Sequence, residues 1–168
     1  MTKDNGKHDL TFKNATYWSN EGHWKWATQP NPREKASFLS ENILPMQESG
    51  HLKFVEPEKL SPFSQFEIFY ASGHTDKMML PMIKYKGKTI CFMADLIPSA
   101  SHIPLPYVMG YDTRPLITME EKERLLNEAA DKNYILFLEH DPLYECCTVQ
   151  RTERGIKLDK TFSLKEIL

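Results

Sequence analysis

Three side chains that can bind a metal ion, those of His74, Asp95 and His140, each follow an apolar stretch of this 168-residue sequence. Imidazole nitrogens and carboxylate oxygens are common ligands of zinc, manganese and iron. A carboxylate directly after an apolar stretch is rarely buried without a partner. We therefore expect the three side chains to converge at the ends of buried strands and to form a metal site.

Each residue also has a simpler structural interpretation. His74 alone is equally well explained as a histidine in a surface turn, Asp95 as a helix N-cap, and His140 as a loop residue. The glycine before His74 is expected to permit a sharp turn that aims the imidazole into a cleft. His102, in the long loop after Asp95, either lines a substrate pocket or is exposed to solvent. The shared position after an apolar strand favours the metal site.

The elements that must position these residues are short strands around one helix. The apolar spacing predicts strands at Phe66–Ala71, Met78–Tyr85, Thr89–Ala94, Tyr134–Leu138, Leu143–Val149 and Ile156–Leu158. Lys86-Gly87 is predicted to be a hairpin turn. Thr118-Met-Glu-Glu121 has the pattern of a capping box, which predicts a helix from there to about Lys132. A last helical turn is expected within 162–168.

Apolar and polar residues alternate less regularly in the N-terminal third of the sequence. A strand is predicted at Leu10–Trp18, followed by an N-cap at Ser19-Asn20 and a short helix through Ala27. A second helix is predicted from Arg33 to a stop at Pro45. A brief strand is predicted at Leu52–Val55. Together with the central strands, these elements predict one α/β domain over residues 1–168.

Composition excludes several classes of function. Hydrophobic residues make up 40% and charged residues 26%, a profile typical of a globular domain. The net charge of -2 without basic clusters argues against nucleic-acid binding. No apolar run approaches the roughly 20 residues that a bilayer requires, and the polar N-terminus is not that of a signal peptide. The three cysteines (Cys91, Cys146 and Cys147) cannot all pair, and two adjacent ones rarely form a disulfide, which favours a reduced, cytoplasmic protein.

The ordered motifs resemble one known family. Gly73-His74-Thr75, then Phe-Met-Ala-Asp95-Leu, then Leu-Glu-His140-Asp141-Pro142 are similar to the metallo-β-lactamase-fold hydrolases, closest to the branch with lactonases and ester hydrolases. The stretch from Phe12 to Trp18 also resembles a strand of such proteins. The resemblance implies an αββα sandwich, of which this chain would form the C-terminal part.

The resemblance also implies roles for individual residues. His74 would complete the ligands of a first metal ion, Asp95 would bridge two ions, and His140 would bind the second. The ions would be zinc, manganese or iron, and a hydroxide held between them would attack a small-molecule substrate. His102 and Tyr111 would border the substrate pocket. These residues do not distinguish between lactone, ester, thioester, β-lactam and phosphotriester substrates.

The sequence departs from the family in one respect. The His-x-His-x-Asp-His signature, which supplies the other metal ligands, does not occur in it. We therefore expect weak metal binding and little hydrolysis by this chain alone, as in a truncated hydrolase. The alternative is a non-catalytic remnant or partner-binding module with half of the fold, so enzyme activity is left open. An uncovered sheet face is expected to make the chain a homo-oligomer.

Overall fold

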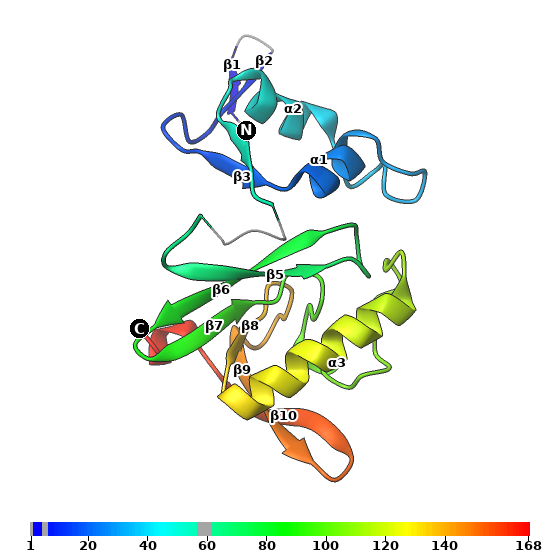
Figure 1. Ribbon diagram of the computed structural model, residues 1–168, viewed down its shortest axis with the longest axis vertical. Helices are drawn as coiled ribbons and strands as arrows, with labels where there is room; N and C mark the ends of the chain where they lie inside the picture. Colours follow the sequence, from blue (N-terminus) through cyan, green and yellow to red (C-terminus); the bar gives the residue numbers. More distant parts are fainter. Residues whose placement is uncertain (1, 5–6, 57–61) are drawn as a thin grey trace. The chain divides into compact units, whose positions relative to one another are not determined.

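The protein is described by a computed structural model that covers residues 2–4, 7–56 and 62–168 (Figure 1). The chain divides into two compact units, Met1–Pro62 and Phe63–Leu168, which are described here one at a time. All of the residues predicted to form the site lie in the second unit. The prediction of a single domain over residues 1–168 stays a prediction.

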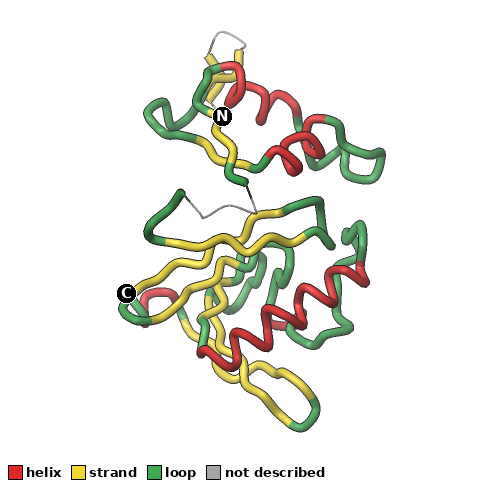
Figure 2. The backbone as a smooth tube through the Cα atoms, viewed as in Figure 1, coloured by secondary structure: helices red, strands yellow, loops and turns green. Residues whose placement is uncertain are grey.

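The second unit is built on one mixed six-stranded sheet (Figure 2). Its strands are β5 (Phe66–Ala71), β6 (Met78–Tyr85), β7 (Lys88–Phe92), β8 (Ile135–Phe137), β9 (Cys146–Thr152) and β10 (Gly155–Phe162). Their spatial order is β10-β9-β8-β7-β6-β5, and every neighbouring pair is antiparallel except β7 and β8. The expected α/β class is therefore confirmed.

Helix α3 (Pro115–Lys132) packs along the sheet and covers its hydrophobic core (Figure 1). Its fully buried side chains Leu125, Leu126 and Ala129 share the core with Leu80 of β6. The spacing of three and four residues puts all three on one helix face, so the apolar pattern of the sequence identified the packed face correctly.

The start of α3 differs from the prediction. The helix begins at Pro115, whereas the sequence predicted a capping box at Thr118-Met-Glu-Glu121. Proline suits the first turn of a helix because its ring fixes φ near the helical value. Its lack of an N–H removes no hydrogen bond there, since the first N–H groups have no acceptor within the helix. Thr118 is consequently inside the helix, and the Glu121 side chain accepts the N–H groups of Ser72 and Gly73 instead of capping the helix. The helix ends at Asn133, whose left-handed φ of 54° stops it.

The hairpin between β6 and β7 is confirmed. Lys86 and Gly87 have φ values of 47° and 74°, as a two-residue turn of type I′ requires. Strand β7 ends at Phe92, two residues before the predicted end, because Ala94 takes a φ of 42° and turns the chain.

The C-terminal strands are also shifted. Strand β9 begins at Cys146, not at Leu143, because the Asp141 carboxylate accepts the N–H groups of Leu143 and Tyr144 at 2.9 Å and holds them in a turn. Strand β10 continues past the predicted end at Leu158, through a bulge, to Phe162. The expected last helical turn is a short 3-10 helix, η2 (Leu164–Glu166).

In its described residues, the first unit holds two small sheets and two helices. Its elements are β1 (Thr2–Asp4), β2 (Lys7–Asp9), β3 (Tyr17–Ser19), α1 (Glu21–Thr28), α2 (Ser40–Glu48) and β4 (Leu52–Phe54). The predicted N-cap is confirmed, since Asn20 accepts a hydrogen bond from the His23 N–H at 2.8 Å. Strand β4 lies where it was predicted and pairs with β3 in parallel.

Two predictions in this unit are wrong. Within the predicted strand Leu10–Trp18 only Tyr17 and Trp18 are extended in a strand, because residues 11–14 form a turn. The helix predicted from Arg33 begins at Ser40 and contains Pro45 instead of stopping there. The Asn31 side chain accepts the N–H groups of Arg33 and Glu34, which holds that segment in turns rather than a helix.

In the described parts of the chain, no helix is both long enough and apolar enough to cross a membrane.

Candidate metal centre

The three predicted metal-binding residues lie at one edge of the sheet. Strands β5 and β7 are each antiparallel to β6, and β7 is parallel to β8, so β5, β7 and β8 run in the same direction. His74 follows β5, Asp95 follows β7 and His140 follows β8. Their C-terminal ends therefore bring residues that are far apart in the sequence to the same place.

Asp95 lies between the two imidazoles. Its Oδ2 is 3.5 Å from Nε2 of His74, and its Oδ1 is 3.2 Å from Nε2 of His140. The His74 side chain is 18% exposed and that of Asp95 is 33% exposed, so the centre opens to solvent mainly on the side of His140. Each carboxylate oxygen thus faces a different nitrogen, an arrangement that is compatible with a carboxylate bridging two cations.

A second carboxylate, which the sequence analysis missed, orients His74. Asp112 Oδ1 lies 2.9 Å from His74 Nδ1, and the Asp112 side chain is 1% exposed. A neutral His74 that donates its Nδ1 proton to Asp112 presents the lone pair of Nε2 toward Asp95. Histidines that bind metals commonly have such a carboxylate partner on the other ring nitrogen. No spacing in the sequence marks Asp112, because it lies 38 residues from His74 in an irregular loop.

The backbone that carries His74 is fixed to the start of α3. The Glu121 carboxylate accepts the N–H groups of Ser72 at 2.6 Å and of Gly73 at 3.0 Å. A Cβ atom on Gly73 would lie 2.2 Å from the backbone nitrogen of Thr118. The expected sharp turn is therefore not the reason for this glycine, whose φ is outside the left-handed region. Glycine is required because the loop passes directly against the helix backbone.

The backbone that carries His140 is fixed by the segment after Asp95. The His140 N–H donates to the Pro98 carbonyl at 3.1 Å, and Asp141 accepts the Ala100 N–H at 2.9 Å. Burial raises the pKa of Asp141, but hydrogen bonds from the N–H groups of Ala100, Leu143 and Tyr144 outweigh it and leave that pKa below its ordinary value. Asp141 therefore stays ionised and ties the two loops together.

A buried lysine orders the long loop beside the centre. Lys122 of α3 is 0% exposed, and its Nζ donates to the carbonyls of Pro104, Leu105 and Tyr107 at 2.7–3.2 Å. Burial lowers the pKa of Lys122 to about 8. The sequence showed Lys122 only as one polar residue of an amphipathic helix, so this anchor was also missed.

The two residues predicted to border a substrate pocket have different settings. His102 is partly buried, and its Nδ1 is 2.8 Å from Oγ of Ser99. Burial, and then the positive charge of Lys122, lower the pKa of His102, so a neutral imidazole is favoured there. Tyr111 is 76% exposed, with its side chain largely in solvent. Their roles toward a substrate stay predictions.

The donor types at this edge suit zinc, manganese or iron, but the number of donors is low. Among the described residues there is no group of three or more His, Cys, Asp or Glu side chains arranged to hold one ion. One ion beside His74 and Asp95, or one beside Asp95 and His140, would have two protein ligands, whereas catalytic zinc normally has three. Cys91 and Cys147 lie in the apolar core, where burial raises the pKa values of their thiols to about 12.

Comparison with known proteins gives matches among solved structures only. No protein-family model matches the sequence, and no curated protein matches it. A probable metal-dependent hydrolase from Staphylococcus aureus is 23% identical with a TM-score of 0.77, over 92% of this chain and 56% of its own. AidC, a dizinc quorum-quenching lactonase, is 20% identical with a TM-score of 0.71, over 92% and 57%. Hydrolase AbOPH in the beta lactamase superfamily is 17% identical with a TM-score of 0.75, over 93% and 59%.

The chain has the metallo-β-lactamase fold. It spans about half the length of the solved structures that it matches, from 46% to 59%. Their names describe metal-dependent hydrolases, among them lactonases. The chain order of strand, His74, hairpin, Asp95, helix, strand and His140 brings these three side chains to one edge of the sheet.

Proposed function

We propose that this chain is part of a metal-dependent hydrolase of the metallo-β-lactamase superfamily, acting on a lactone, an ester or a related small molecule. His74 and His140 would each bind one of two metal ions, and Asp95 would bridge them. The single observation that supports this proposal is the position of Asp95, with one carboxylate oxygen toward each Nε2.

A bound zinc ion would lower the pKa of water to about 7 and would polarise the scissile carbonyl. The chain itself supplies positioning. Asp112 holds the ring of His74, Glu121 holds the loop that carries His74, and Asp141 ties the segment next to His140 to the loop after Asp95. His102 and Tyr111 would contact the substrate from the loop after Asp95.

The two ions would need further ligands, because the three residues supply only two protein donors to each. We therefore propose that this chain alone binds metal weakly and hydrolyses substrate slowly, and that full activity requires donors from elsewhere. The second candidate function is a non-catalytic module that keeps half of the fold. It is favoured by the same donor count and by the coverage of 46–59% of the matched structures.

The first experiment is equilibrium dialysis of the purified chain against zinc, followed by elemental analysis. Saturable zinc binding by the wild type and its loss in Asp95→Asn are expected, while Glu153→Gln, an equal charge change at an exposed turn, should bind normally. Equal zinc content in the wild type and Asp95→Asn would refute the metal centre. Zinc binding without turnover of any lactone or aryl ester would favour the non-catalytic module.

We also propose that the chain forms a homo-oligomer through the sheet face opposite α3. On β5 and β6 that face presents Ile68, Tyr70, Met79 and Pro81, as the register and alternation place them. Ile83 on the same face is 42% exposed. Sedimentation velocity over a range of concentrations tests this, and a monomer at every concentration would refute it.

A further inference from the structure

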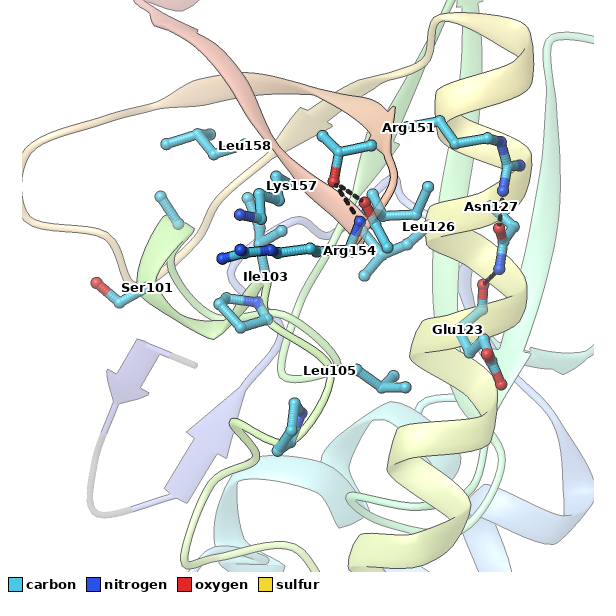
Figure 3. Close-up of a pocket in the computed structure, with 16 residues that line it drawn as sticks. Ser101, Ile103, Leu105, Glu123, Leu126, Asn127, Arg151, Arg154, Lys157 and Leu158 are labelled. Carbon is cyan, nitrogen blue, oxygen red and sulfur yellow. Dashed lines mark hydrogen bonds between the residues drawn. The ribbon is translucent and has the colours of Figure 1, made fainter.

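A cavity of about 870 Å³ lies on the side of the second unit formed by α3, the segment 100–106 and the β9–β10 hairpin (Figure 3). None of the proposed metal ligands lines it. Its volume is within the range of about 300–1,000 Å³ that is typical of small-molecule sites. It is therefore large enough for a ligand of its own, separate from the metal centre.

The floor of the cavity is apolar and fixed. Ile103 and Leu126 are 1% and 2% exposed, and both belong to the core. The segment that carries Ile103 is held by Lys122, which donates to the carbonyls of Pro104 and Leu105. Ile156 and Leu158 of β10 add apolar surface on the opposite wall. An apolar ligand would therefore meet a preformed surface.

The hairpin adds cations without partners to this apolar floor. Among the described residues, Arg154 and Lys157 make no side-chain hydrogen bond or ion pair; both are exposed, and Figure 3 shows them among the side chains that line the cavity. Arg151 is different, since Asn127 and Asp131 accept hydrogen bonds from its guanidinium at 2.8 and 2.7 Å. Glu123 of α3 is the one carboxylate among the lining residues, so the hairpin side of the cavity, with Arg154 and Lys157, is the part that is complementary to an anion with an apolar body.

The turn of the hairpin fixes the backbone of Arg154. The Thr152 hydroxyl donates to the Gly155 carbonyl at 2.7 Å and accepts the Arg154 N–H at 3.2 Å (Figure 3). Gly155 has a φ of 93°, a conformation that favours glycine. These contacts fix the backbone that carries the Arg154 side chain before any ligand binds, which reduces the backbone entropy lost on binding.

We propose that this cavity binds a small carboxylate with an apolar tail. The carboxylate pairs with Arg154 and Lys157, and the tail lies on Leu105, Ile156 and Leu158, the apolar lining residues that remain partly exposed. The site is independent of the proposed metal centre and of the hydrolase activity.

The proposal is tested by isothermal titration of the full chain with octanoate. One saturable site is expected, with binding at least about tenfold weaker for the neutral 1-octanol, because charge-assisted pairing is lost. Butyrate should also bind more weakly than octanoate, because it buries less apolar surface. Absence of saturable octanoate binding, or equal binding of octanoate and 1-octanol, overturns the proposal.

Variants separate this site from adventitious binding elsewhere. Arg154→Gln combined with Lys157→Gln is expected to weaken octanoate binding at least about tenfold. Lys160→Gln combined with Lys165→Gln removes the same charge at exposed residues outside the cavity and should change nothing. Leu158→Asn should weaken octanoate binding but leave butyrate binding unchanged. Equal losses in the two charge variants, at unchanged melting temperatures, refute the site.

Discussion

Replacing Asp112 with Asn separates a role in orienting His74 from a role in stability. The substitution keeps the shape of the side chain, and an amide oxygen can still accept the proton of His74 Nδ1. The substitution removes the negative charge 2.9 Å from that nitrogen. In the wild type, this charge makes Nε2 of His74 a better metal ligand. Removal of such a partner typically weakens metal binding about 10- to 100-fold, and the conservative Asn should lie near the lower value.

The stability of the metal-free protein should respond differently. Asp112 is buried, and its Oδ2 has no hydrogen-bond partner among the described residues, so loss of the charge removes a desolvation cost. Against this, the favourable charge of Asp112 next to Lys122 is also lost. Because these effects oppose each other, the free energy of unfolding should change by no more than about 1 kcal/mol.

The assay is zinc affinity by chelator competition, beside denaturant unfolding of the metal-free protein. Asp112→Asn should lose about tenfold in zinc affinity with nearly unchanged stability, and Asp112→Ala should lose more. Asp131→Asn, at an exposed ion pair with Arg151, is the control. Wild-type zinc affinity in Asp112→Asn, or a loss that follows a matching loss of stability, would refute the orienting role.

Three further outcomes are expected. Gly73→Ala should destabilise the fold by about 3 kcal/mol in urea unfolding, since its Cβ would overlap the Thr118 backbone, whereas Gly110→Ala meets open space and should not. The pKa of Lys122 is about 8 in the folded protein and has its ordinary value of 10.5 in the unfolded chain, so the unfolded chain binds more protons between these two pH values. The free energy of unfolding should therefore rise with pH by about 3 kcal/mol over this range, relative to that of Lys122→Met. Cys91 and Cys147, with pKa values of about 12, should react with iodoacetamide at pH 8 only as fast as the protein unfolds.

The hydrophobic pattern by itself determined the central strands. The predicted bounds of Phe66–Ala71 and Met78–Tyr85 match β5 and β6, and Lys86-Gly87 forms the expected turn. These features depend on alternation and backbone preference within a few residues, both of which are visible in a sequence. The position of His74, Asp95 and His140 after apolar strands was readable for the same reason.

Tertiary structure decided how that site is held. The partners of His74 and Gly73 are Asp112 and Glu121, which lie 38 and 48 residues away, and no local pattern distinguishes them from ordinary polar residues. Lys122 looks like a solvent-facing lysine until the loop after Asp95 folds over it. Hydrogen bonds between distant segments depend on the completed packing of α3 on the sheet, so only the folded chain reveals them.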